Sequence, residues 1–248
     1  LPGSSLGYMA GLFHLMNHAF FKALLFLGSG AVIHAVHTQD MREMGGLRKD
    51  MPITSLTMGL GVLSIAGVPF FSGFWSKDEL LVAVYYNAEY EGIFGGLWFM
   101  ALITAGMTAF YMTRMWMMTF SGPSSRMVSS IVSSEDHSVT GNWVLEEKKV
   151  HSHAHEAPLV MTLPLMILSL LAVTSGLTLV FGGGFSSHVY YGEPHESHGM
   201  IQWEIIDHIL SSSLTYLSVA VGLTGILFGV LFYKRGPDGN AAFSTDFV

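Results

Sequence analysis

The sequence contains no cysteine among its 248 residues, and only 12% of the residues are charged. Without cysteine the chain can form neither disulfides nor thiolate-ligated zinc or iron–sulfur sites, so any electron transfer must take place in a partner. Soluble domains carry roughly 25% charged residues. A chain that is 50% hydrophobic and so poor in charge is composed like a membrane protein.

Basic residues are also scarce, with 11 Lys and Arg against 18 Asp and Glu and a net charge of −7. Proteins that bind nucleic acid neutralise phosphates with clustered Lys and Arg, so the composition argues against a nucleic-acid partner. The apolar fraction is too high for a disordered chain, and the 28 glycines suit close contacts between helices in lipid. We therefore expect the lipid bilayer to surround this protein.

Five apolar stretches are long enough to cross the bilayer core, which requires about 20 helical residues. They cover approximately residues 9–36, 53–86, 93–120, 158–182 and 212–233. The sequence therefore predicts an all-α polytopic membrane protein with about five transmembrane helices. An inner loop is expected over 121–157 and an outer loop over 183–211.

Lys and Arg are unevenly distributed among the connections. They follow the first, third and fifth spans, whereas the connections 87–92 and 183–211 contain neither. Because basic residues accumulate on the cytoplasmic side of a membrane, this alternation predicts that the N-terminus lies outside and the C-terminus inside.

Three ionisable residues lie within the first span at intervals of four: His14, His18 and Lys22. Four residues advance a helix by roughly 400°, so the three side chains share one face. An ionisable group at membrane depth costs several kcal/mol unless it has a partner or serves a path. Imidazole donates and accepts protons near neutral pH, and a buried lysine can switch its charge, so the spacing predicts a proton path.

The second span is too long for one straight crossing and is interrupted by GVPFFSG at residues 67–73. Pro69 lacks a backbone donor and the glycines on either side loosen the helix, so we predict a break between two half-helices. Irregular backbone at this depth survives only inside protein or beside water, and such breaks mark ion sites in transporters. Lys77 and Asp78 follow the break, and we expect them to pair there; the alternative is an interfacial charge cluster at an ordinary helix end.

The residues also allow two other classes of protein. The alternating histidines at 151–155, followed by Glu156, could bind a divalent metal, as in a metal transporter. Intramembrane lysines repel cations, so a solvated loop without metal is the favoured interpretation. A haem carrier needs axial histidines from two spans, whereas the deep histidines here all lie on the first span. No cofactor or metal is expected in this chain.

Four segments resemble the antiporter-like L subunits of proton-translocating NADH-quinone oxidoreductase, in the membrane arm of respiratory complex I. The segments are HLMNHAFFKALLFLGSGAVIHA, DMREMGGLRKDMP, GVPFFSGFWSKDELL and HAHEAPLVMTLPLMIL, and the likeness covers most of residues 7–182. The resemblance implies a proton-translocating subunit without its own redox centre, next to other antiporter-like subunits in a prokaryotic plasma membrane or an organelle inner membrane. The A subunit of multisubunit Na+/H+ antiporters is similar and is the closest alternative.

The resemblance also implies roles for individual residues. His14 and His18 match the family's central-axis histidines, Lys22 matches its middle lysine, and Lys77 with Asp78 match the pair at the broken helix on the exit side. Depth and charge predict different tasks for the two lysines: Lys22, mid-span without an adjacent carboxylate, relays protons, whereas Lys77, beside Asp78 and nearer the outer face, acts as an exit gate. The family's earlier broken helix, its Glu–Lys pair and its lateral helix have no counterpart here, so the chain is expected to be an excised second half of a translocation unit that does not pump alone.

Overall fold

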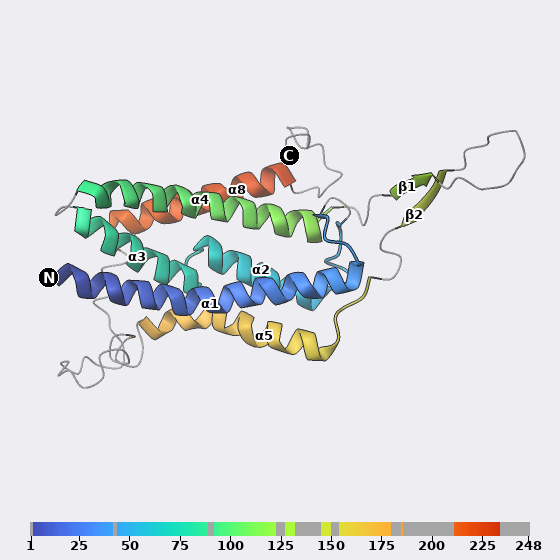
Figure 1. The fold of residues 1–248 in the computed structure, drawn as a ribbon, viewed down its shortest axis with the longest axis horizontal. Helices are drawn as coiled ribbons and strands as arrows, with labels where there is room; N and C mark the ends of the chain where they lie inside the picture. Colours follow the sequence, from blue (N-terminus) through green and yellow to red (C-terminus); the bar gives the residue numbers. More distant parts are fainter. Residues whose placement is uncertain are drawn as a thin grey trace, which may run out of the picture.

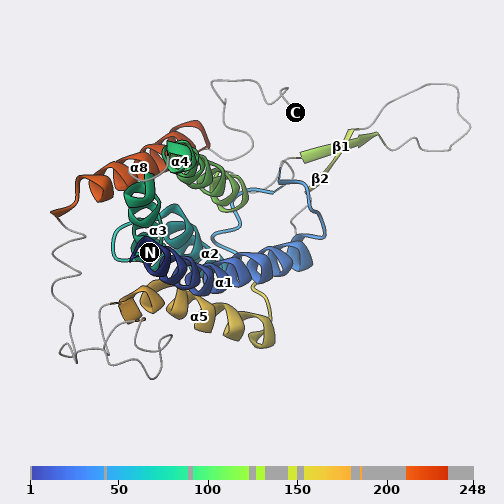
Figure 2. The ribbon, with the colours of Figure 1, turned by 60° about the vertical axis from the view of Figure 1, so that its left-hand side comes forward.

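A computed structural model describes residues 2–41, 44–88, 92–122, 127–131, 145–149, 154–179, 185 and 211–233. The chain forms a bundle of roughly aligned helices with a small hairpin beyond one end (Figures 1 and 2). In this described part, four helices are long and apolar enough to cross a membrane, and another crossing is divided between two shorter helices. The prediction of an all-α polytopic protein with about five transmembrane helices, the second of them broken, is confirmed.

The helices alternate in direction along the chain. They are α1 (Pro2–Val36), α2 (Pro52–Ala66), α3 (Ser72–Ala88), α4 (Gly92–Phe120), α5 (Leu159–Thr174) and α8 (Ser213–Tyr233), and a short 3-10 turn, η2 (Ser175–Leu179), continues α5. In Figure 1, α1, α4 and α8 run in one direction, whereas α2, α3 and α5 run in the other. Within the described residues the chain thus runs the length of the bundle five times in alternating directions, with α2 and α3 sharing the second passage.

A two-stranded hairpin lies in the stretch expected to be the inner loop. Strand β1 (Met127–Ile131) pairs antiparallel with β2 (Leu145–Lys149), and Met127 lies opposite Lys149. The sequence did not predict this hairpin. Val128 and Ile131 favour strands, but the charged run over residues 146–149 carries no alternation of apolar and polar residues.

The helix break lies within the predicted segment. Gly67 ends α2 in the left-handed conformation, with φ +77°, which glycine adopts without steric cost. The N–H of Gly67 donates to the Ser64 carbonyl and that of Val68 to the Leu63 carbonyl, the pattern of a Schellman cap. Pro69 then has no N–H with which to resume the helix, and α3 begins at Ser72.

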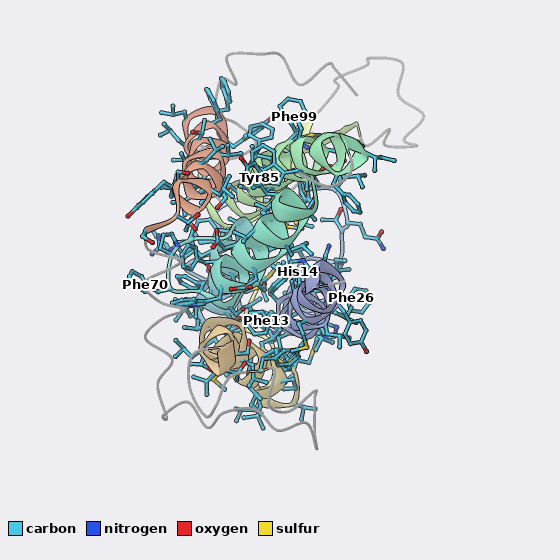
Figure 3. The ribbon with its side chains drawn as sticks, turned by 90° about the vertical axis from the view of Figure 1, so that its left-hand side faces the viewer. Phe13, His14, Phe26, Phe70, Tyr85 and Phe99 are labelled. Atoms are coloured by element: carbon cyan, nitrogen blue, oxygen red, sulfur yellow. The ribbon has the colours of Figure 1, made fainter. Side chains whose placement is uncertain are left out.

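The bundle packs apolar side chains inward and leaves others on its outer surface. Phe21 and Leu24 of α1 are fully buried in a cluster with Leu165 of α5. On α1, Phe26 lies on the outer side and is 77% exposed, while His14 faces the region next to α3 (Figure 3). Exposed apolar side chains of this kind are expected where a helix faces lipid or a partner subunit.

Candidate functional site

A cavity of about 330 Å³ lies between α1, α3 and α4, next to the helix break. Four of the five predicted site residues line it: His14, His18 and Lys22 on α1, and Lys77 on α3. The other lining residues are mostly apolar, with three hydroxyl groups from α4: Phe21, Ile65, Leu80, Leu81, Ala101, Thr104, Ala105, Thr108 and Tyr111. The fold thus brings together polar residues that the sequence places on two separate spans.

The two histidines of α1 are neighbours on one helix face, as their spacing predicts. Their ring centroids lie 5.8 Å apart. The rings of His18 and Phe21 also lie edge to face, at 5.1 Å between centroids. The Nδ1 atom of His14 lies 3.1 Å from the Oγ atom of Ser76 on α3, so a hydrogen bond extends the polar row of α1 to the second half-helix.

Lys77 is held by the end of α2. Its Nζ atom donates a hydrogen bond to the carbonyl of Ile65. In an uninterrupted helix this carbonyl would accept the N–H of residue 69, but residue 69 is Pro69 and has none. The break therefore leaves an acceptor at the carboxyl end of α2, where the helix dipole favours a cation.

Asp78 lies outside the cavity and contacts a different helix. It is only 2% exposed, and its Oδ2 atom accepts a hydrogen bond of 2.9 Å from the hydroxyl of Thr215 on α8. Consecutive residues of a helix project about 100° apart, so Lys77 and Asp78 are directed at different neighbours. These hydrogen bonds connect Lys77 to α2 and Asp78 to α8, and the pairing of the two residues stays a prediction.

Lys22 lies at the open side of the cavity. Its side chain is exposed in this chain, whereas Lys77 is half-buried. A lysine ringed by apolar residues at mid-span is costly to leave in lipid. We therefore expect polar groups outside the described residues, and not lipid, to surround its ammonium group.

Sequence reasoning did not identify Ser76 and Thr215, which hydrogen-bond predicted site residues, nor the buried Asn17 on the same helix as the two histidines. Ser76 forms a hydrogen bond with His14, and Thr215 donates one to Asp78. Asn17 is fully buried and accepts a 2.6 Å hydrogen bond from Ser175. Ser76 could have been found from its position next to Lys77. Thr215 offered no such signal, because a lone threonine in an apolar helix commonly bonds to its own backbone.

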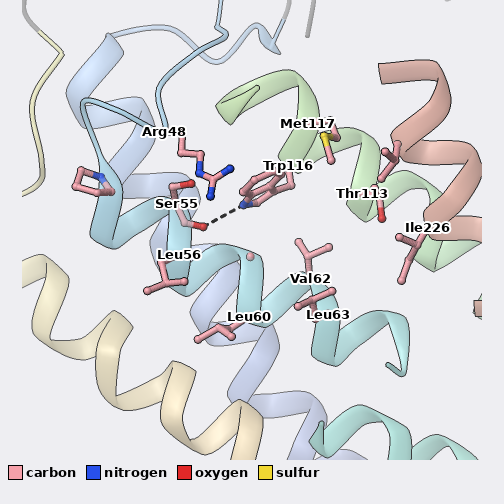
Figure 4. A pocket seen from close by; sticks show the side chains of 13 residues that line it. Arg48, Ser55, Leu56, Leu60, Val62, Leu63, Thr113, Trp116, Met117 and Ile226 are labelled. Atoms are coloured by element: carbon pink, nitrogen blue, oxygen red, sulfur yellow. Dashed lines mark hydrogen bonds between the residues drawn. The ribbon is translucent and has the colours of Figure 1, made fainter. Parts of the chain in front are cut away.

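A second cavity, of about 470 Å³, lies between α2, α4 and α8 near the start of α2 (Figure 4). Its walls are mostly apolar, with Arg48 among the lining residues. Trp116 fixes α4 against α2 here, because its indole Nε1 donates to the Ser55 carbonyl at 3.0 Å. None of the predicted site residues lines this cavity, so it is separate from the polar row.

The histidine segment before α5 was the alternative candidate for a metal site. His151 and His153 lie outside the described residues. Within the described ranges, no group of three or more His, Cys, Asp or Glu side chains is arranged to hold a metal ion. The carboxylate of Glu156 instead accepts hydrogen bonds from the start of α2.

The chain is similar to a family model and to curated proteins that all carry the name NADH-quinone or NAD(P)H-quinone oxidoreductase. Residues 2–108 match the family model for the transmembrane region of NADH:quinone oxidoreductase and Mrp antiporter proteins. The chain is 43% identical over 245 residues to NAD(P)H-quinone oxidoreductase chain 5 of Picosynechococcus sp., covering 92% of this chain and 34% of that protein. It is 40% identical over 236 residues to NADH-quinone oxidoreductase subunit L of Mycobacterium tuberculosis, covering 93% and 32%. The chain thus spans about a third of the length of the curated relatives it matches.

Proposed function

We propose that this chain, which matches the family of NADH:quinone oxidoreductase and Mrp antiporter membrane subunits, forms the second half of the translocation unit of a proton-translocating L-type subunit. The subunit works within an NADH-quinone oxidoreductase, an enzyme whose redox reaction drives translocation. The chain has no cysteine with which to ligate an iron–sulfur cluster, and electron transfer in this proposal takes place in partner subunits. This chain contributes a path for protons and requires no cofactor of its own.

One observation carries this proposal: His14, His18, Lys22 and Lys77 line a single cavity beside a broken helix. Protons move between groups that can both donate and accept, and imidazole does so near neutral pH. Ionisable side chains at membrane depth are otherwise costly. A row of four around one cavity is therefore better explained by proton transfer than by structural support.

The two lysines have different tasks in this scheme. Lys22, at the open side of the cavity, relays the proton, and its closed surroundings come from the parts of the complex beyond this chain. Lys77 is the exit gate, because the carboxyl end of α2 stabilises its ammonium form. A proton leaves Lys77 when that contact or its hydration changes.

The subunit is an integral component of an energy-coupling membrane, with its N-terminus outside and its C-terminus inside. Its partners are the other membrane-arm subunits, above all the neighbouring antiporter-like ones. The A subunit of a multisubunit Na+/H+ antiporter is the second candidate, because the matched family includes Mrp antiporters. The chains that co-purify with the full-length protein distinguish the two, since dehydrogenase core subunits belong to the first and small antiporter subunits to the second.

The experiment is to substitute Lys22→Met in the full-length parent and to measure proton translocation and quinone reduction by the assembled complex in vesicles. We expect fewer protons per electron pair while quinone reduction is partly retained. Lys22→Arg should not restore translocation fully, because a guanidinium does not deprotonate in proteins. Lys49→Met is the matched control, since Lys49 is exposed and lies outside the cavity. Wild-type translocation by assembled Lys22→Met would remove Lys22 from the path.

A further inference from the structure

The amino end of α2 is capped by a side chain from a distant part of the sequence. The residue before the helix, Met51, supplies no side-chain cap, and Pro52 at the first helical position has no N–H. The carboxylate of Glu156 takes that place: Oε2 accepts from the N–H of Ile53 at 2.6 Å and of Thr54 at 3.4 Å, and Oε1 accepts from the Thr54 hydroxyl at 2.6 Å.

The remaining donors of this first turn are satisfied by backbone. The N–H of Met51 donates to the Leu47 carbonyl at 2.8 Å, and that of Ser55 donates to the Met51 carbonyl at 2.9 Å. A helix leaves its first N–H groups without partners inside the helix. Glu156 therefore supplies the acceptors that this end of α2 would otherwise lack.

Glu156 also joins α2 to α5. Its Oε1 atom accepts the N–H of Ala157 at 3.2 Å, and α5 begins two residues later, at Leu159. The carboxylate is thus fixed relative to α5 while it holds α2. The result is a link between two elements that are more than a hundred positions apart in the sequence.

The opposite end of α2 holds Lys77 through the Ile65 carbonyl. A helix carries partial positive charge at its amino end and partial negative charge at its carboxyl end. The carboxylate of Glu156 lies at the amino end of α2, and the ammonium group of Lys77 lies at its carboxyl end. With 15 residues, α2 is about 22 Å long. Hydrogen bonds such as that from Trp116 to the Ser55 carbonyl hold it from the side, and the charged groups at its two ends add contacts directed along its axis.

We infer that Glu156 is a positioning residue for Lys77: it fixes the axial position of α2, and α2 in turn presents the Ile65 carbonyl to the lysine. The inference rests on the proposed function, in which Lys77 releases protons. When the hydrogen bonds of Glu156 to the amino end of α2 are lost, α2 shifts along its axis. The hydrogen bond from Lys77 to the Ile65 carbonyl then weakens. The lysine is then held less firmly, although Glu156 itself lies outside the cavity.

The test uses the full-length parent in the assembled complex, with Glu156→Ala, Glu156→Gln and Thr54→Val. Asp50→Asn is the matched control, because Asp50 is an exposed carboxylate close to the same end of α2. The first readout is the rate at which a small, membrane-permeant, amine-reactive reagent modifies Lys77. Mass spectrometry measures this rate, and modification of Lys22 in the same sample is the internal reference. The second readout is the number of protons moved per electron pair.

We expect Glu156→Ala and Thr54→Val to raise modification of Lys77 several-fold while that of Lys22 stays unchanged, and to lower translocation. Glu156→Gln should lie between these variants and wild type, because an amide keeps a carbonyl acceptor but loses the charge. Asp50→Asn should match wild type in both readouts. If the Glu156→Ala variant does not assemble, the Glu156→Gln and Thr54→Val variants test the positioning role instead.

The outcomes separate the two proposals. Unchanged modification of Lys77, or an equal rise at Lys22 and Lys77 from general loosening, would overturn the positioning role of Glu156. A selective rise at Lys77 with unchanged translocation would support the positioning role and instead contradict the role of Lys77 as exit gate.

Discussion

The Nδ1 atom of His14 on α1 lies 3.1 Å from the Oγ atom of Ser76 on α3. Ser76 is fully buried and directly precedes Lys77. A hydroxyl group can donate or accept a hydrogen bond, so Ser76 can pair with His14 whichever ring nitrogen carries the proton. This hydrogen bond connects the first span to the second half of the broken one.

Ser76→Ala is predicted to lower proton translocation by the assembled complex and to leave quinone reduction largely intact. The substitution removes the group that orients the His14 ring. Ser76→Thr, which keeps the hydroxyl, should recover part of the loss. The measurement is protons moved per electron pair in vesicles.

Ser29→Ala is the control for this change, because the Ser29 hydroxyl bonds only to its own helix, at the Phe26 carbonyl, among the described hydrogen bonds. Equal translocation by the Ser76→Ala and Ser29→Ala complexes would show that the His14–Ser76 contact has no part in the path.

Thr215→Val is predicted to destabilise the subunit. It removes the hydroxyl that donates to the buried carboxylate of Asp78, and the loss of such a partner costs about 1–3 kcal/mol. Thr215→Ser should restore stability, whereas Thr224→Val on the same helix should have little effect, because Thr224 is exposed and bonds to the Ala220 carbonyl. Thermal unfolding of the purified complex measures the effect, and equal melting of both valine variants would contradict it.

Gly73→Ala is predicted to prevent normal assembly. An added Cβ atom would lie 1.8 Å from the carbonyl oxygen of Ser64, so the start of α3 would have to move away from α2. Gly96→Ala on α4 is the matched control, since nothing lies within 4 Å of its added Cβ. The amount of subunit found in the assembled complex is the measurement, and normal incorporation of the Gly73 variant would show that the two half-helices can separate freely.

Gly225→Ala is predicted to weaken the packing of α8 on α4. Its Cβ atom would lie 2.5 Å from the Gly106 carbonyl oxygen and 3.0 Å from the Ala109 Cβ atom, and overpacking of this kind costs about 1–3 kcal/mol. A lower melting temperature of the complex is the expected result. Gly30→Ala should melt like wild type, because its added Cβ meets no described atom within 4 Å.

The sequence by itself determined the features that depend on a residue's own backbone or on spacing along one helix. Gly67 and Pro69 end and interrupt the second span through their own conformational limits, so these residues alone locate the break. His14 and His18 share a face because of the helical repeat alone. The assignment to membrane proteins followed equally directly from the sequence, since apolar stretches of this length match the thickness of the bilayer core.

Only the tertiary structure decided which groups meet across helices. Ser76 lies 62 positions from His14, Glu156 lies 102 positions from Thr54, and Thr215 lies 137 positions from Asp78. Adjacency in the sequence suggested a Lys77–Asp78 pair, which stays a prediction, but gave no sign that Lys77 bonds to α2 and Asp78 to α8. The physical reason is that contacts between helices depend on their relative rotation and axial shift, which are set by the packing of whole faces and not by the periodicity of any one segment.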